Sequence, residues 1–191
     1  QSSRAAGATS DAPGDYKVKI RSVKSGEESV YTYADLKLAG NQKLPLAPGT
    51  YVVSAESPDH ADYMAGTSCA DWERPVYFGS VTKNVIKRTE TQVNDLVCTL
   101  ANIKTTVTLT QDLQELFMSD AEAEAAGKEK LTVTLSVGDN RLVFDRAAAD
   151  AGKAGYFKAV EASNTVKVVL SGQYNKAAAD EAPEYVAVNW T

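Results

Sequence analysis

Apolar and polar side chains alternate in short runs along most of the chain, and this alternation restricts the fold more than any other feature. Residues 16–20 place Tyr16, Val18 and Ile20 on one side and lysines on the other, which is the period-two pattern of a half-buried strand. Runs of the same kind follow at 30–36, 51–55, 75–81, 84–86, 91–100, 103–109, 131–137, 141–144, 156–160, 166–170 and 185–190. Short strands separated by turn residues predict antiparallel β-sandwiches.

One segment has the spacing of a short helix. Thr110 can cap its N-terminus, and Leu113, Leu116 and Phe117 form an apolar stripe at i, i+3 and i+4. The segment 120–130, rich in alanine and glutamate, is either a helical extension or a solvated loop, and we expect a loop. The predicted fold is therefore all-β, with two tightly coupled antiparallel β-sandwich domains and one short helix.

The division between the two sandwiches is predicted next to Ala101 and Asn102, because only these two residues separate neighbouring strands. Residues 1–14 contain no large apolar side chain and cannot offset their ordering entropy by burial. We therefore expect a flexible tether over 1–14, an N-terminal β-sandwich over 15–101 and a C-terminal β-sandwich over 102–191.

The charge balance restricts the class of partner. The chain has 20 Lys and Arg against 25 Asp and Glu, a net charge of -5, whereas a nucleic-acid-binding surface carries a basic excess to meet the phosphates. No apolar run approaches the roughly 20 residues that cross a bilayer. We expect no nucleic-acid partner and no membrane-spanning segment.

The search for catalytic residues centres on His60, the only histidine. A Ser-His-Asp or Cys-His arrangement would have to use it, and a solvated loop histidine is the alternative. As metal ligands, Asp59, His60, Asp62 and Asp71 share one region, but their spacing matches neither an EF-hand nor a zinc pattern. We expect no catalytic residues, no metal, no cofactor and no enzymatic activity.

A long loop over 57–74 is the expected place of binding, because loops of this length are often functional. Tyr63, Trp72 and Tyr77, with neighbouring Phe78, give it an aromatic character. These rings could stack on a sugar or fill a partner's pocket; the alternative is that they close the end of a sandwich core. Tyr63, Trp72 and Tyr77 are the candidate binding residues.

The two cysteines leave two interpretations open. Cys98 lies on the apolar side of its expected strand, where a thiol behaves as a small hydrophobic group. The alternative is a disulfide between Cys69 and Cys98, which would fasten the 57–74 loop to the sheet.

Several segments carry a family resemblance: Leu46-Ala47-Pro48-Gly49-Thr50-Tyr51, Pro75-Val76-Tyr77-Phe78-Gly79-Ser80 and Cys98-Thr99-Leu100-Ala101-Asn102. They resemble an uncharacterised family of Bacteroidetes surface lipoproteins, a domain of unknown function that is fimbrillin-like in architecture. The resemblance implies an exported protein at the outer membrane or cell surface, held by a lipid on a cysteine upstream of Gln1. Because Gln1 is not methionine, we expect a mature exported or trimmed form.

The resemblance also implies a function without transferring any catalytic residue. We expect a non-enzymatic structural or adhesion lipoprotein whose ligand is an unidentified protein or glycan. The alternative is a carbohydrate-binding module of a surface glycan-acquisition system, with Trp72 and Tyr77 stacking on the sugar. Strand exchange between subunits would need alternating apolar residues, which 1–14 lacks, so we expect a monomer or weak self-association.

Overall fold

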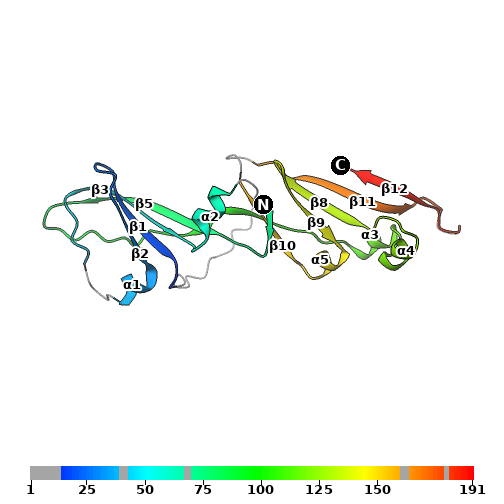
Figure 1. The fold of residues 1–191 in the computed structure, drawn as a ribbon, viewed down its shortest axis with the longest axis horizontal. Coiled ribbons are helices and arrows are strands. Elements are labelled where there is room, and N and C mark those ends of the chain that lie inside the picture. Colours follow the sequence, from blue (N-terminus) through cyan, green and yellow to red (C-terminus); the bar gives the residue numbers. More distant parts are fainter. Residues whose placement is uncertain (1–13, 39–42, 67–69, 160–163, 179–180) are drawn as a thin grey trace. The chain divides into compact units, whose positions relative to one another are not determined.

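The computed structural model describes residues 14–38, 43–66, 70–159, 164–178 and 181–191. This part of the chain is mostly β, with three antiparallel sheets and short helices between the strands (Figure 1). Except for Gly14, the predicted tether lies outside the described residues.

The chain divides into two compact units. Unit 1 extends to Asp62 and also includes Val76–Leu100, whereas unit 2 consists of Tyr63–Pro75 and Ala101–Thr191. Residues 63–75 lie within the expected N-terminal sandwich, 15–101, but group with unit 2 in the structure.

Unit 1 contains a single five-stranded antiparallel sheet in the order β2-β1-β3-β5-β6. Its strands are β1 (Lys17–Ser22), β2 (Glu28–Thr32), β3 (Gly49–Glu56), β5 (Tyr77–Val85) and β6 (Thr99–Leu100). The period-two pattern has the expected effect, because Val18 lies opposite Ala55 and Val53 lies opposite Val81 on one face. The lysines of β1 lie on the other face.

The core of unit 1 is small. Val18, Val53 and Ala55 are its buried apolar residues. The second layer is made by helix α1 (Tyr33–Leu38) and by the 86–98 segment, whose Leu96 and Cys98 pack against this cluster. The apolar face of the sheet is therefore covered by one helix and by extended chain.

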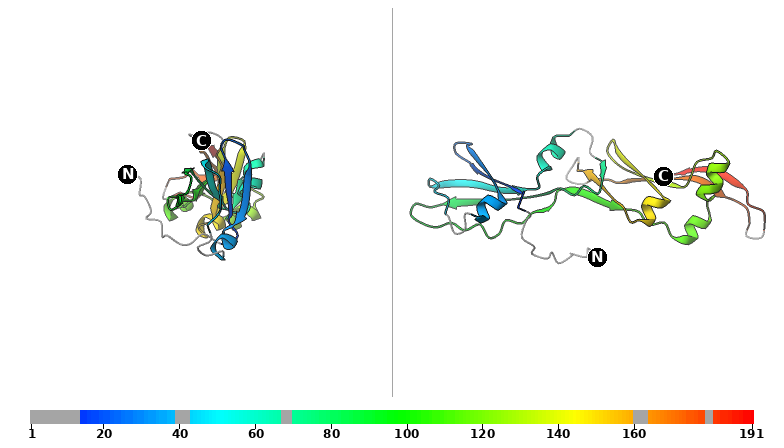
Figure 2. Two further views of the ribbon diagram at one scale, coloured as in Figure 1. Left: turned by 90° about the vertical axis from the view of Figure 1, so that its left-hand side faces the viewer. Right: turned by 60° about the horizontal axis from the view of Figure 1, so that its bottom comes forward.

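Unit 2 contains two sheets. The three-stranded sheet has the order β4-β10-β7, and the four-stranded sheet has the order β12-β11-β8-β9. Their strands are β4 (Ala70–Trp72), β7 (Asn102–Thr106), β8 (Thr132–Val137), β9 (Asn140–Asp145), β10 (Ala154–Lys158), β11 (Lys167–Asn175) and β12 (Tyr185–Trp190). The second view in Figure 2 shows β11 and β12 running side by side, as their pairing requires.

The core of unit 2 is much larger and draws on both sheets. Phe157 comes from the three-stranded sheet, while Val137 and Phe144 come from the four-stranded sheet, and all three are fully buried in one hydrophobic cluster. Burial alternates strictly along β8 and β9, so each of these strands has one face in the core.

The prediction of one short helix is wrong, because the described residues contain five. Helix α3 (Gln111–Glu115) begins after Thr110, whose side chain accepts a hydrogen bond from the Leu113 amide, as expected. The expected loop over 120–130 instead begins with helix α4 (Asp120–Ala125). Ser119 and Glu122 form a capping box at its start, which satisfies two amide donors that would otherwise lack partners.

Other helices replace expected strand or loop. The strand expected over 30–36 ends at Thr32, and α1 begins at Tyr33. The region expected as a 57–74 loop contains helix α2 (His60–Ala65) and strand β4. Helix α5 (Arg146–Asp150) is capped by Asp145.

The strand expected over 91–100 is reduced to Thr99–Leu100. Residues 91–98 form no strand, yet they pass very close to β5. A Cβ atom added at Gly79 would lie 2.1 Å from the carbonyl oxygen of Val97, so only glycine allows this approach. None of the helices in the described ranges is both long enough and apolar enough to cross a membrane.

Candidate functional site

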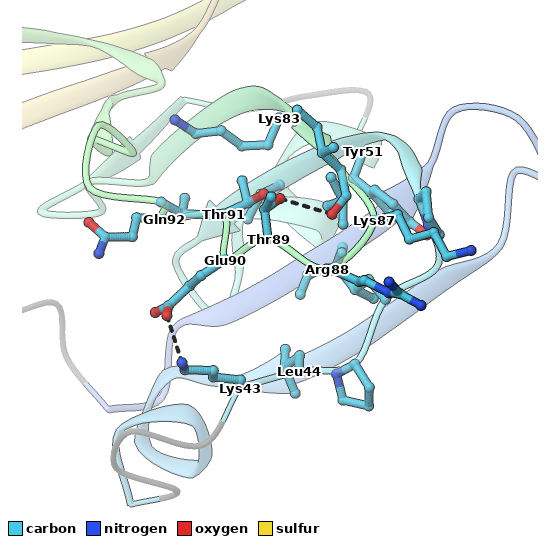
Figure 3. Close-up of a pocket in the computed structure, with 18 of the residues that line it drawn as sticks. Lys43, Leu44, Tyr51, Lys83, Lys87, Arg88, Thr89, Glu90, Thr91 and Gln92 are labelled. Carbon is cyan, nitrogen blue, oxygen red and sulfur yellow. Dashed lines mark hydrogen bonds and ion pairs between the residues drawn. The ribbon is translucent and has the colours of Figure 1, made fainter.

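A pocket of about 930 Å³ lies on the apolar side of the unit 1 sheet (Figure 3). Side chains from three strands contribute to it, among them Ile20, Val53 and Val85. Its walls are two segments outside the strands, 43–48 and 86–94. The pocket thus occupies part of the layer that a second sheet would fill in a complete sandwich.

Local sequence explains why the two walls do not pair as strands. Pro45 and Pro48 have no amide hydrogen, and they keep the 43–48 segment out of the sheet. The other wall begins with a turn in which the amide and hydroxyl of Thr89 both donate to the Ile86 carbonyl, at 3.2 and 2.9 Å. Arg88 in this turn has a φ of 63°, a left-handed conformation that non-glycine residues seldom adopt.

The pocket exposes aliphatic side chains to solvent. Leu44 and Leu46 are each 38% exposed, Val93 is 41% exposed and Ile86 is 58% exposed. Isolated exposed leucines are normal, but a group of apolar side chains around one hollow is typical of an interaction site.

Basic side chains surround these aliphatic residues. The ammonium group of Lys43 lies 2.6 Å from the Glu90 carboxylate, and that of Lys83 lies 2.6 Å from Asp95. The hydrogen bond from Lys83 lowers the pKa of the Asp95 carboxyl. Lys87 and Arg88 are exposed and have no acidic partner among the described residues. The pocket therefore has an aliphatic interior and a basic rim.

His60 belongs to a different cluster, on the opposite face of the unit 1 sheet. Its Nδ1 lies 3.0 Å from one oxygen of the buried Glu56 carboxylate, and the ammonium group of Lys19 lies 2.7 Å from the other. The His60 ring stacks on Phe78 at 4.9 Å between centroids. Burial would raise the pKa of Glu56, but the hydrogen bonds from Lys19 and His60 outweigh it, so this pKa is lowered.

Each oxygen of the Glu56 carboxylate therefore has a partner, Lys19 for one and His60 for the other. A general base, by contrast, needs a free oxygen aimed at a reacting group. Asp71 pairs with Arg74 at 2.9 Å, and within the described ranges no three His, Cys, Asp or Glu residues form a group that could hold a metal ion.

The three candidate aromatic residues are divided between the units, with Tyr63 and Trp72 in unit 2 and Tyr77 in unit 1. Tyr63 lies in α2 and is only 2% exposed; its ring has the Arg74 guanidinium 5.2 Å from the centroid. Trp72 lies in β4 and packs edge-on against Phe144 at 4.6 Å. Tyr77 belongs to unit 1, where its amide donates to the Ser57 hydroxyl at 3.1 Å. For Tyr63, the alternative of a core position is the one that the structure supports.

Trp72 is partly exposed and lines a hollow of about 290 Å³. Asp145 and Lys153 are polar residues of this hollow, and the Lys153 ammonium lies 5.5 Å from the centroid of the Trp72 ring. Trp72 and Tyr77 are both half-buried, and Trp72 lies next to polar groups.

Within the described part of the chain Cys98 has no disulfide partner. It is half-buried, packs against the unit 1 core and donates to the Ala55 carbonyl at 3.5 Å. Burial raises the pKa of this thiol, as expected for a group in apolar surroundings. Cys69 lies outside the described residues, so the disulfide between Cys69 and Cys98 stays a prediction.

Sequence reasoning did not identify the unit 1 pocket. The two walls are about 40 residues apart in the sequence. Strands β3 and β5 lie between them in the sequence, and the pairing of these strands brings the walls together. Two signals were nevertheless present: Pro45 and Pro48 lie next to Leu44 and Leu46, and Lys87-Arg88 follows one residue after the end of β5.

Comparison with known proteins gives one match. A family model described as a domain of unknown function, DUF4493, matches residues 1–190. No curated protein and no solved structure matches the chain.

Proposed function

We propose that this chain, which belongs to the DUF4493 family, is a non-enzymatic structural or adhesion protein of the cell surface that binds a partner through the unit 1 pocket. The observation that carries the proposal is the group of exposed aliphatic side chains around that pocket, Leu44, Leu46, Ile86 and Val93. Exposed apolar surface of this kind costs free energy in water and is stabilised when a partner covers it.

The contacts of His60 support the non-enzymatic part of the proposal. Its Nδ1 is engaged by Glu56 and its ring is stacked on Phe78. A histidine held in this way stabilises the folded sheet. Hydrolysis of a substrate that His60→Gln abolishes would contradict this part.

The surface location rests on the resemblance to Bacteroidetes lipoproteins. In this proposal a lipid upstream of Gln1 anchors the chain to the outer membrane, and residues 1–14 act as a spacer. The sandwich architecture is also proposed. It is supported in unit 2 by the hydrophobic cluster that both sheets share.

A binding assay with a matched pair of variants tests adhesion through the pocket. The purified chain is immobilised and exposed to a panel of extracellular matrix proteins and glycans. Leu46→Arg places a charge in the pocket, whereas Leu116→Arg changes an exposed leucine of unit 2. We expect Leu46→Arg to abolish binding of a protein ligand and Leu116→Arg to preserve it, with circular dichroism showing that both variants fold.

A carbohydrate-binding function is the second candidate, and the hollow beside Trp72 favours it. A sugar could stack on the accessible part of the Trp72 ring while Asp145 and Lys153 bond its hydroxyls. Tryptophan fluorescence tests this candidate, since Trp72 and Trp190 are the two tryptophans. Quenching by a glycan that persists in Trp190→Phe and disappears in Trp72→Phe would support it over protein adhesion.

A further inference from the structure

We propose that the unit 1 pocket binds an extended, acidic peptide segment with aliphatic side chains from a partner protein. The inference rests on the proposed adhesion function and names the chemistry of its partner. Three properties of the pocket lead to it: the kind of apolar side chain inside, the charge at the rim and the state of the backbone in the walls.

The interior of the pocket matches aliphatic side chains. Ile20, Val53 and Val85 contribute from the strands, and leucines and prolines contribute from the 43–48 wall. Tyr51 is the only aromatic residue among the described lining residues, and its hydroxyl donates to the Ala47 carbonyl at 2.9 Å. Sugars and aromatic ligands favour open aromatic faces, whereas branched aliphatic side chains fit a lining of this kind.

The charge at the rim is complementary to carboxylates. Lys87 and Arg88 extend to the same side of the pocket in Figure 3, while the Lys43–Glu90 ion pair lies on the other side. The whole chain has a net charge of -5, so this basic rim is a local feature and does not follow from composition. Complementary charge speeds association and selects among partners.

The walls favour an extended ligand. Within the described part of the chain, the backbone of 43–48 and of 90–94 forms no hydrogen bond with another backbone group. Pro45 and Pro48 have no amide hydrogen, and the Ala47 carbonyl already accepts from Tyr51. The other amides and carbonyls of the two walls can bond to an extended peptide that lies beside them. A compact ligand such as a single carboxylate could not reach along both walls.

Fluorescence anisotropy with a synthetic probe tests the proposal on the whole chain. The probe is a short, capped, fluorescein-labelled peptide of alternating valine and glutamate, and its control carries lysine in place of every glutamate. We expect saturable binding of the valine–glutamate peptide, weakened at high ionic strength, and no binding of the valine–lysine peptide. Equal binding of both peptides would overturn the proposal.

A double substitution assigns the binding to the rim. Lys87→Gln with Arg88→Asn removes both charges, and asparagine tolerates the left-handed backbone at position 88. The matched control is Lys24→Gln with Lys128→Gln, two exposed lysines outside the pocket. The rim variant should weaken binding about tenfold, the effect of losing two exposed ion pairs, and the control should change it less than twofold. Equal effects of the two double variants would overturn the proposal.

The matrix-protein assay keeps the two proposals separable. If the valine–glutamate peptide fails to bind but Leu46→Arg still abolishes adhesion, the acidic-peptide inference is wrong and the adhesion function stands. If Leu46→Arg leaves adhesion unchanged, the adhesion function is wrong at this site. Self-association that the rim variant abolishes would show a second copy of the chain as the occupant and would overturn the inference of a separate partner.

Discussion

Unit 1 and unit 2 differ in how the apolar faces of their antiparallel sheets are covered. In unit 2 both sheets contribute to one hydrophobic cluster, in which Val137, Phe144 and Phe157 are fully buried. Unit 1 covers its sheet with helix α1 and extended chain, so its buried apolar cluster is limited to Val18, Val53 and Ala55. The comparison teaches that a sheet covered by one helix and extended chain buries less apolar surface and leaves part of its apolar face accessible.

Large-to-small substitution in the unit 2 core should have the largest effect. Phe144→Ala removes a fully buried ring and leaves a closed cavity, which should lower the free energy of unfolding by about 3–5 kcal/mol. Chemical denaturation followed by circular dichroism measures this loss. A loss below about 1 kcal/mol would mean that the shared cluster of unit 2 is loosely packed.

Gly79→Ala should have the next largest effect, and it acts on the second layer of unit 1. The added methyl group would meet the Val97 carbonyl oxygen, a backbone atom that cannot move aside independently. We expect a loss of about 1–3 kcal/mol and faster labelling of Cys98 by thiol reagents. Ser80→Ala, at the neighbouring exposed position, is the control and should be nearly neutral. If Cys98 is labelled equally fast in both variants, Gly79 does not determine where the 86–98 segment packs.

A matched pair of valines sharpens the comparison between the units. Val137 is enclosed in unit 2, whereas Val53 lines the unit 1 pocket. Val137→Ala should cost about 2 kcal/mol and Val53→Ala about 1 kcal/mol, because only the first leaves a sealed cavity. Equal losses, measured by the same denaturation experiment, would show that the pocket is closed in solution.

The smallest predicted effect concerns acid stability in unit 1. The pKa of Glu56 is lowered from its ordinary value of 4.5 in the folded state, so the unfolded state takes up its proton first as the pH falls. The stabilisation by Lys19 and His60 is therefore complete above about 4.5 and is lost below it. Glu56→Gln should remove this part of the acid dependence in denaturation measured across pH, whereas Glu28→Gln at an exposed position should retain it.

The sequence predicted the strands well where one face of a strand meets a core. In β8 and β9 the alternation of side chains matches the alternation of burial, because a period of two is visible without knowledge of the partner strand. The short helices were harder to predict, since each depends on a local cap. Helix α4 shows this: the pair Ser119 and Glu122 was a readable signal, but the composition of 120–130 pointed to a loop.

The candidate site was less predictable than the fold. Tyr63 and Trp72 looked like loop residues because the 57–74 region lacks clear alternation, yet Tyr63 is buried in α2 and Trp72 packs in β4. The unit 1 pocket could not be derived from the sequence, because it exists only once the sheet brings 43–48 and 86–94 together.

Hydrogen–deuterium exchange of the whole chain, with and without the valine–glutamate peptide, tests the central contrast most directly. In the free chain we expect the amides of 90–94 to exchange fast and those of β8 and β9 to exchange slowly, because only the latter are hydrogen-bonded within a sheet. The peptide should slow exchange in 90–94 and leave β8 and β9 unchanged. Equal protection of both regions in the free chain, or peptide protection confined to unit 2, would contradict the assignment of unit 1 as the open binding unit.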